Sequence, residues 1–302
     1  MVSDVSVVIV NWNGAHYLEA CLNSLYDVPS VIVVDNGSVD GSGALVRRSF
    51  PAVTLLEAGR NLGFSAANNI GARQSSSPYI LFLNNDTVVK AGAIESMRQA
   101  FHLDHRIAVV GARLEWPDGR LQSSSLGRPP SLGREIRRLL HIGYDELAGG
   151  GAAEYHTSHH TSMVCGAAMM VRRDVFRAIG GWSERYFAYA EDADLCRQVS
   201  ERGYRIWFES SARVVHYAGG SWKRLGVWPA IRLLYLSHHS VSAYIRKYDG
   251  RGKALLHRAL FPASVLAAGV RRVARAAAAL LHHRRPKPTN SATRERSCSS
   301  ST

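Results

Sequence analysis

The chain has 302 residues, of which 46% are hydrophobic, and its formal net charge is +13. It is long enough to bury a large core, as one α/β domain with additions or as two small domains. The start has neither a basic stretch nor a cleavage site, and the four cysteines lack metal-type spacing. These features argue against a secretory signal and a cysteine metal site, and they favour a cytosolic protein with reduced thiols.

The first part of the sequence alternates predicted strands with predicted helices. Strands are predicted at residues 5–10, 31–34, 53–57, 79–83 and 107–114. Helices are predicted at residues 15–25, 40–49, 66–74 and 91–101. This alternation is typical of βαβ units, so we expect an α/β, Rossmann-like fold with a mostly parallel central sheet flanked by helices. Residues 1–114 form its first half.

Residues 115–220 form the second half of the predicted domain. A turn, read as a hairpin, is expected at residues 116–120. Residues 122–161 are rich in Ser, Gly, Pro and His and predict a flexible insertion, with one short basic helix near residues 132–142, that could carry substrate contacts. The predicted strands are residues 163–172, 204–208 and 212–216, and the predicted helices are residues 174–179 and 191–202.

Beyond residue 220 the pattern becomes helical and basic. Residues 246–288 hold eleven Lys or Arg and one acid, so this segment alone contributes +10. We expect a basic amphipathic helical extension over residues 221–283 and a disordered tail over residues 284–302. The apolar residues 255–281 are too often interrupted by charge to span a membrane. They fit a helix on an anionic membrane surface, or a helix packed on the body with solvated charges.

A buried apolar run at residues 79–83 stops at Asn84, Asn85 and Asp86. Ligands of open α/β sheets bind at the carboxyl ends of the strands. A carboxylate there could hold a divalent cation, and through it phosphates. The alternative is that Asp86 caps the next helix.

The turn after the second predicted strand is also polar. Asp35 could accept hydrogen bonds from a base or from ribose hydroxyls, and Asn36, Ser38 and backbone N–H groups could serve other polar ligand atoms. The alternative is a strand–turn–helix connection whose Asp and Ser act as caps. Further on, the adjacent Asn68 and Asn69 are poor helix formers, which suggests a polar task at a ligand cleft.

Three carboxylates, Glu191, Asp192 and Asp194, begin a later predicted helix. Capping of the helix start accounts for part of this cluster but not for its size. A carboxylate near a sugar hydroxyl can act as a general base. His216 ends a predicted strand and could ligate a metal, although a lone histidine is more often structural.

Taken together, the sequence from about residue 5 to residue 220 resembles family 2 glycosyltransferases with the GT-A fold, especially the rhamnosyltransferase-like branch. The motifs that carry the resemblance are VVIVNWNG, VVDNGSVDGS, NLGFSAANNIG, LFLNNDTVV, GGWSERYFAYAEDADLC and ARVVHYAGG. The resemblance implies an inverting transfer of a single sugar, since the QxxRW motif of processive relatives is missing.

The resemblance also assigns roles to individual residues. It implies that Asp192 is the general base, that Glu191 positions it or the acceptor, and that Trp182 stacks on the acceptor sugar. Asp86 matches the residue that ligates Mg²⁺ or Mn²⁺, with His216 near the metal. The residues implied to bind the nucleotide sugar are Asn11, Asp35, Asn36, Ser38, Asn61, Asn68 and Asn85.

One position departs from the family pattern. Asn84 stands where the DxD-type motif has its first Asp, which leaves one carboxylate for the cation and favours weak or transient metal binding. The implied donor is a nucleoside-diphosphate sugar, with dTDP-rhamnose first and UDP or GDP sugars next. The implied acceptor is a glycan or lipid-linked acceptor of the cell envelope, and the implied location is cytoplasmic, peripheral at the inner face of the cell membrane.

Other readings of the sequence remain open. A sugar nucleotidyltransferase would carry a basic, glycine-rich phosphate loop after the first strand, whereas residues 11–14 contain no Lys or Arg. A catalytically silent binding scaffold would not need Asp35, Asp86 and Asp192. Nucleic acid is disfavoured as a partner because the basic tail is interleaved with Leu, Ala and Val more than with aromatic residues.

Overall fold

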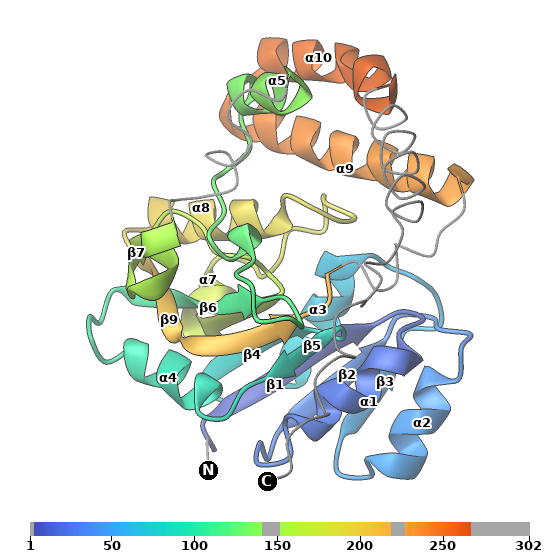
Figure 1. Cartoon of the computed structure of the whole chain (residues 1–302), viewed down its shortest axis with the longest axis vertical. Helices are drawn as coiled ribbons and strands as arrows, with labels where there is room; N and C mark the ends of the chain where they lie inside the picture. Colours follow the sequence, from blue (N-terminus) through green and yellow to red (C-terminus); the bar gives the residue numbers. More distant parts are fainter. Residues whose placement is uncertain (1–2, 141–151, 219–226, 267–302) are drawn as a thin grey trace, which may run out of the picture. The chain divides into compact units, whose positions relative to one another are not determined.

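The computed structural model describes residues 3–140, 152–218 and 227–266 (Figure 1). The chain divides into two compact units, Met1–Phe261 and Pro262–Thr302, and the description below concerns the first. The division falls later than the boundary at residue 220 expected from the sequence. The predicted tail at residues 284–302 and most of the predicted surface helix lie outside the described residues.

The first four strands of the central sheet are parallel. They are β1 (Val5–Asn11), β2 (Val31–Asp35), β3 (Thr54–Glu57) and β4 (Tyr79–Asn84), in the order β3-β2-β1-β4. The connecting helices are α1 (Ala15–Asn23), α2 (Ser42–Ser49) and α3 (Phe64–Gln74). Each strand and each helix lies close to its predicted range, because alternation of buried strands with amphipathic helices is a strong local signal.

The rest of the sheet is mixed, so the prediction of a mostly parallel sheet holds only for its first half. β8 (Ala168–Arg172) lies antiparallel between β4 and β6 (Ile107–Glu115). β9 (Arg205–His216) runs parallel to β6 and antiparallel to β5 (Thr87–Val89) and β7 (His159–Thr161). Residues 107–115 and 205–216, which belong to the two halves expected from the sequence, therefore share one sheet.

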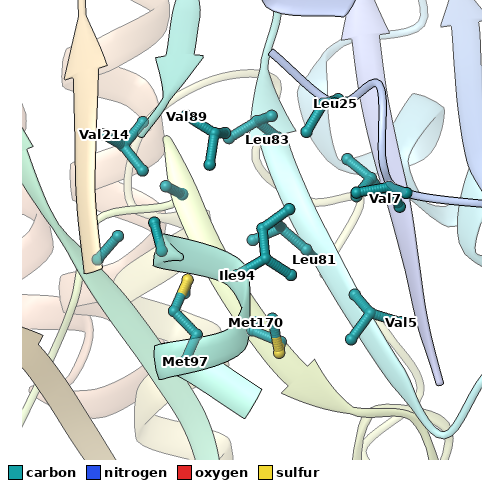
Figure 2. Packing of buried hydrophobic residues seen from close by; sticks show 14 of the residues in the cluster. Val5, Val7, Leu25, Leu81, Leu83, Val89, Ile94, Met97, Met170 and Val214 are labelled. Atoms are coloured by element: carbon teal, nitrogen blue, oxygen red, sulfur yellow. The ribbon is translucent and has the colours of Figure 1, made fainter. Parts of the chain in front are cut away.

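Two apolar clusters cover the two faces of the sheet. Alternate residues of β1 divide between them: Val7 and Ile9 lie in one cluster and Val8 in the other. Figure 2 shows the first cluster, in which Met97 of α4 (Ala93–Ala100) lies near Leu81 and Met170. Burial on both faces explains why these strands are continuous apolar runs.

The predicted insertion at residues 122–161 is largely built of regular structure where it is described. It contains two short 3₁₀ turns, Ser123–Ser125 and Ala152–His156, as well as α5 (Leu132–Leu140) and β7. α5 is fastened by a contact of 4.0 Å between its Glu135 and His257. Residues 141–151 of the insertion lie outside the described part.

The remaining helices join the second half of the sheet to a helical layer. They are α7 (Arg173–Ala178), α8 (Glu191–Glu201), α9 (Val227–Tyr248) and α10 (Arg251–Ala259). Asp194 of α8 accepts hydrogen bonds from Lys247 (2.7 Å) and Tyr248 (2.9 Å) of α9. α9 includes the predicted helical spacing from residue 231 to residue 248. Among the described residues, no helix combines the length and the apolar character needed to cross a bilayer.

Candidate active site

Polar side chains from three parallel strands meet at one edge of the sheet. Asn11 and Asp35 are register partners at the ends of β1 and β2. Asn11 accepts a hydrogen bond from Asn85 (2.7 Å) and donates one to the Ser38 hydroxyl (3.1 Å), while the Ser38 N–H donates to Asp35 (3.1 Å). The structure thus brings together four of the residues predicted to bind the nucleotide sugar.

Asn36 is bonded to the loop that contains Asn61. Asn36 is buried, and its amide donates to Asn61 Oδ1 (3.1 Å) and Gly63 O (3.3 Å) while accepting from the Leu62 N–H (2.8 Å). All of its polar atoms are engaged in holding the loop of residues 61–63. Gly37 lies in the left-handed region (φ +79°), with the Arg60 backbone 2.6 Å from where a Cβ would stand. In this structure the Asn36 side chain positions this loop, and the nucleotide contact implied for Asn36 and Asn61 stays a prediction.

The asparagine pair in α3 also forms hydrogen bonds within the protein. Asn68 is 1% exposed and donates to Phe64 O (3.1 Å) within its own helix. Asn69 accepts from the Trp182 N–H and donates to Trp182 O, both at 2.9 Å. Asn69 therefore fastens α3 to the turn after α7, and the nucleotide contact implied for Asn68 stays a prediction.

Trp182 does not offer a stacking surface for an acceptor sugar. It is 1% exposed, and its ring packs edge-on against Phe64, Phe82 and Phe176, with ring centroids 5.1–6.4 Å apart. Gly180 and Gly181 both have positive φ, and they turn the chain back toward α3. The Trp182 ring is therefore directed into the core. Stacking on an acceptor sugar, the role that the resemblance implies for Trp182, would require this ring to leave its buried position.

Asp86 and His216 lie side by side, as predicted from their places at strand ends. His216 Nε2 is 3.4 Å from Asp86 Oδ1, and both residues are buried. Asn84 Nδ2 also lies 3.4 Å from His216 Nε2. The pairing of β5 with the end of β9 brings the two residues together, since Thr87 is the register partner of His216.

Gln122 determines which nitrogen of His216 carries the proton. The Gln122 amide nitrogen contacts two carbonyl oxygens, Glu115 O (3.3 Å) and His216 O, and carbonyls can only accept. Gln122 Oε1 is therefore the atom 3.0 Å from His216 Nδ1, and it accepts the Nδ1 proton. Nε2 is then the ring nitrogen that faces the Asp86 carboxylate. A partner that fixes the tautomer of a histidine in this way is typical of histidines that bind metals.

The residues of the described ranges contain no group of three or more His, Cys, Asp or Glu placed to hold a metal ion. The pair Asp86–His216 could supply only two protein ligands. Mg²⁺ in proteins is commonly held by one or two carboxylates together with substrate phosphates and water. The residues present fit a cation whose remaining ligands come from a bound diphosphate.

Asp192 and Glu191 begin α8 as predicted. Asp192 accepts from the Gly166 N–H (3.3 Å) and from the Ala193 N–H (2.8 Å). Burial raises the pKa of Asp192. Burial and the neighbouring Asp192 charge raise the pKa of Glu191 to about 8, and Glu191 Oε2 is buried without a hydrogen-bond partner. A carboxylate with a raised pKa is a better proton acceptor at neutral pH.

Backbone strain marks the same place. Tyr189 and Ala190, directly before the two carboxylates, both have left-handed backbones (φ 69° and 68°) without being glycine. Such residues typically cost about 1–3 kcal/mol each and gather at functional sites. The unusual turn aims Glu191 and Asp192 at the segment around Gly166 instead of at solvent.

The segment around Gly166 lies between the predicted metal site and the predicted base. The N–H of Asn84, two residues before Asp86, donates to Ala167 O (2.9 Å), and the Gly166 N–H donates to Asp192 (3.3 Å). One short segment therefore contacts both places, although 106 positions separate Asp86 from Asp192. Cys165 belongs to this segment, and burial together with the charges of Asp192, Glu191 and Asp86 raises the pKa of its thiol to about 12.

Residues that the sequence interpretation missed come from the stretch between the motifs. Gln122 and Gly166 contact His216 and Asp192, but neither belongs to a recognisable pattern of spacing. The hairpin turn predicted at residues 116–120 was the one available signal for Gln122, because a hairpin returns the chain toward the sheet, as the antiparallel bridge between Glu115 and Leu121 does.

Comparison with known proteins agrees with this geometry. A sequence profile described as "Glycosyl transferase family 2" matches residues 6–180. The N-acetylglucosaminyl-diphospho-decaprenol L-rhamnosyltransferase of Mycobacterium tuberculosis is 28% identical over 264 residues, which cover 81% of this chain and 84% of the relative.

Solved structures share the fold. A mannosyltransferase from Pyrobaculum calidifontis, in complex with GDP-Man and Mn²⁺, has a TM-score of 0.57 at 20% identity, covering 93% of this chain and 79% of that one. GalNAc-T7 with UDP, GalNAc and Mn²⁺ has a TM-score of 0.58 at 14% identity, and the match covers 81% of this chain and 48% of that one. These likenesses show the GT-A fold.

Proposed function

The chain belongs to glycosyl transferase family 2, and on that premise we propose that it transfers one sugar from a nucleoside-diphosphate sugar to an acceptor hydroxyl with inversion. The observation that supports the proposal is that the segment of residues 166–167 contacts both Asn84, next to the predicted cation site, and Asp192, beside the polar edge formed by β1, β2 and β4. One carboxylate near the acceptor suffices, since inversion needs no covalent intermediate.

The donor is held by the polar edge of the sheet. Asp35, with Asn11 and Ser38 beside it, binds the nucleoside. Asn85 belongs to the same hydrogen-bond network, because it donates to Asn11. We propose dTDP-rhamnose as the first donor to examine, because a relative covering most of this chain is named as a rhamnosyltransferase. UDP and GDP sugars follow, since a structural neighbour is complexed with GDP-Man.

Asp86 and His216 would hold a divalent cation, with Mn²⁺ or Mg²⁺ as the candidates. Two structural neighbours contain Mn²⁺, which supports this choice. Such a cation supplies charge neutralisation for the departing nucleoside diphosphate. Gln122 keeps the Nδ1 proton of His216 in place, so that Nε2 remains a ligand atom.

Asp192 removes the proton from the acceptor hydroxyl. Its two backbone hydrogen bonds, from Gly166 and Ala193, hold the carboxylate in one orientation. Burial and the neighbouring Asp192 charge raise the pKa of Glu191 to about 8, so Glu191 retains a proton at neutral pH and avoids a second negative charge beside the base.

The acceptor we propose is a lipid-linked glycan of the cell envelope, handled at the inner face of the cell membrane. The relative named above has a diphospho-decaprenol acceptor in its name. On this chain, α10 exposes Leu255 and Leu256 next to Lys253 and Arg258, a composition suited to an anionic lipid surface.

The test is nucleoside diphosphate release from a panel of nucleotide sugars with Mn²⁺ or Mg²⁺. Asp192→Asn should lose at least about 10²–10⁴-fold in turnover, because the general base is removed while its shape is kept. Asp118→Asn, in the exposed turn between residues 116 and 120, is the matched control and should retain turnover. Near wild-type turnover of purified Asp192→Asn would refute the assignment of the base.

A further inference from the structure

A second polar cavity lies outside the site described above. Its volume is about 500 Å³, and Arg128, Arg134, Glu154, His159, Thr161 and Ser162 are among the residues that line it. Asp86, Glu191 and Asp192 do not belong to its wall. The cavity is formed where the chain around Leu126 pairs with Val164 and where α5 begins.

Two arginines give this cavity a positive wall. Burial and the charge of Arg128 lower the pKa of Arg134, so the two guanidinium groups repel each other. Arg134 donates to Pro129 O, which fixes its side chain at the wall. Within residues 3–140, 152–218 and 227–266, neither arginine forms an ion pair with a carboxylate, although Glu154 lines the same cavity. An anion with two adjacent charges would relieve this repulsion.

The remaining wall is polar. Thr161 and Ser162 are among its residues, and the Thr161 hydroxyl also lies 3.4 Å from Met163 O. The proton on His159 Nδ1 is donated to Thr157 O (2.9 Å), so this nitrogen does not serve a ligand. Two guanidinium forks with hydroxyl donors match a diphosphate better than a single carboxylate or sulfate.

The cavity is within one substrate length of the proposed base. Ser162 at its wall precedes Gly166 by four residues, and Gly166 N donates to Asp192 (3.3 Å). Four residues of fully extended chain reach at most about 14 Å. This is the span of a sugar ring followed by its diphosphate, so an acceptor sugar at Asp192 would direct its diphosphate toward the cavity.

We propose that this cavity binds the diphosphate that joins the acceptor sugar to its lipid, with Arg128 and Arg134 as its ligands. The inference rests on the proposed function and assigns a subsite to it. α5 connects the two ends of such an acceptor, because Arg134 faces the cavity while Leu140, at the other end of the helix, is 63% exposed. Glu135 fastens α5 to α10, whose Leu255 and Leu256 are also exposed.

A kinetic experiment distinguishes a specific effect of the two cavity arginines from an effect of the overall positive charge of the protein. Wild type, Arg128→Gln, Arg134→Gln and Arg137→Gln are compared with a lipid-diphosphate-linked sugar acceptor and with an alkyl glycoside of the same sugar. Arg137 is exposed on α5 and is absent from the cavity wall, so Arg137→Gln removes the same charge without touching the subsite.

Each cavity variant should raise the KM for the diphosphate acceptor by roughly 10–100-fold, the effect of losing a charge-assisted hydrogen bond. The KM for the alkyl glycoside and for the nucleotide sugar should stay unchanged, as should both values in Arg137→Gln. Equal KM values in all four proteins, or a KM rise that is the same for both acceptors, would overturn the proposal. Arg128→Gln leaves the Arg134–Pro129 bond intact, so its result stands even if Arg134→Gln folds poorly.

A binding arm keeps the inference distinct from the proposed function. Farnesyl diphosphate, farnesol and UDP are titrated by calorimetry into the full chain in EDTA, where the cation-dependent donor site is weakened. Farnesyl diphosphate should bind wild type and Arg137→Gln but not the double variant Arg128→Gln/Arg134→Gln, and farnesol should bind none. If UDP instead loses binding in the double variant, the cavity belongs to the nucleotide and the proposal fails. If no donor is ever turned over but this pattern holds, the proposed function fails and the diphosphate site stands.

Discussion

At the scale of single residues, the proton on His216 is decided by an amide that is 94 positions away in the chain. Gln122 can accept from Nδ1 only because both of its N–H groups are directed at carbonyls of Glu115 and His216. Groups that orient a metal-binding histidine in this way set its tautomer and its basicity. Gln122 therefore acts on the proposed cation through His216 and does not touch the substrate.

We predict that Gln122→Leu weakens metal activation. The Mn²⁺ concentration for half-maximal activity should rise by roughly 10–100-fold, since the variant no longer holds the Nδ1 proton. The measurement is initial rate against Mn²⁺ concentration at saturating donor. Gln99→Leu, on the exposed side of α4, serves as the control. A loss of activity that is equal at every Mn²⁺ concentration would show that Gln122 only supports the fold.

At the scale of secondary-structure elements, a cluster of buried polar groups joins α5, α9 and α10. His238 of α9 and His257 of α10 stack with ring centroids 4.0 Å apart. His238 Nε2 donates a hydrogen bond to His257 O (2.9 Å), because a carbonyl oxygen only accepts. His257 Nδ1 bonds the Ser242 hydroxyl (2.7 Å), and Glu135 of α5 lies 4.0 Å from His257 Nε2.

This cluster predicts an acid-sensitive helical layer. Burial and the nearby His257 lower the pKa of His238 to about 4, whereas an unfolded histidine titrates near 6.5. As the pH falls, the unfolded chain binds the proton first. The free energy of unfolding is therefore highest, as far as His238 is concerned, above about pH 6.5. It falls progressively toward pH 4, by up to roughly 3 kcal/mol.

Denaturant unfolding of wild type and His238→Phe between neutral pH and pH 5 measures this loss. Wild type should lose free energy of unfolding over the interval, and His238→Phe should lose clearly less. His105→Phe, at a site where the side chain is 92% exposed, should behave like wild type. The groups facing His238 that also carry charge are His257, Glu135 and Arg138. Parallel pH curves for wild type and His238→Phe would contradict the assignment.

At the scale of the whole molecule, charge and exposed apolar residues coincide on the helical layer. The chain carries +13 overall, and α10 exposes Leu255 (65%) and Leu256 (53%) beside basic residues. Basic residues near an anionic bilayer contribute about 1 kcal/mol each, and buried leucines add to this. Asp194 and Lys247 tie this layer to the helix that begins with the proposed base.

We predict that the protein cosediments with anionic phosphatidylglycerol vesicles but not with neutral phosphatidylcholine vesicles, and that added NaCl weakens binding by screening. Leu255→Ser/Leu256→Ser should bind more weakly. Leu103→Ser is the matched control, because Leu103 is as exposed (65%) but lies just beyond α4. A lipid-facing surface would be refuted if Leu255→Ser/Leu256→Ser and Leu103→Ser bound anionic vesicles equally. It would also be refuted if the wild-type protein bound DNA as well as it binds these vesicles.

Several features of the protein follow from the sequence by itself. The places of Asp35, Asp86 and His216 at strand ends, and of Asp192 at a helix start, could be predicted because local apolar runs and their interruptions define where strands and helices begin and end. The parallel order of the first four strands follows from the same alternation of strands and helices.

Only the tertiary structure decided what each polar or aromatic side chain faces. Asn36 and Asn69 form hydrogen bonds to the backbone of loops, and Trp182 is buried among phenylalanines. The motifs in which these residues stand had predicted that they contact a ligand. Gln122, in turn, reaches His216 from a segment without a motif. The physical reason is that burial and hydrogen-bond partners depend on which distant segments the sheet places together, and the mixed half of this sheet has no signature in sequence periodicity.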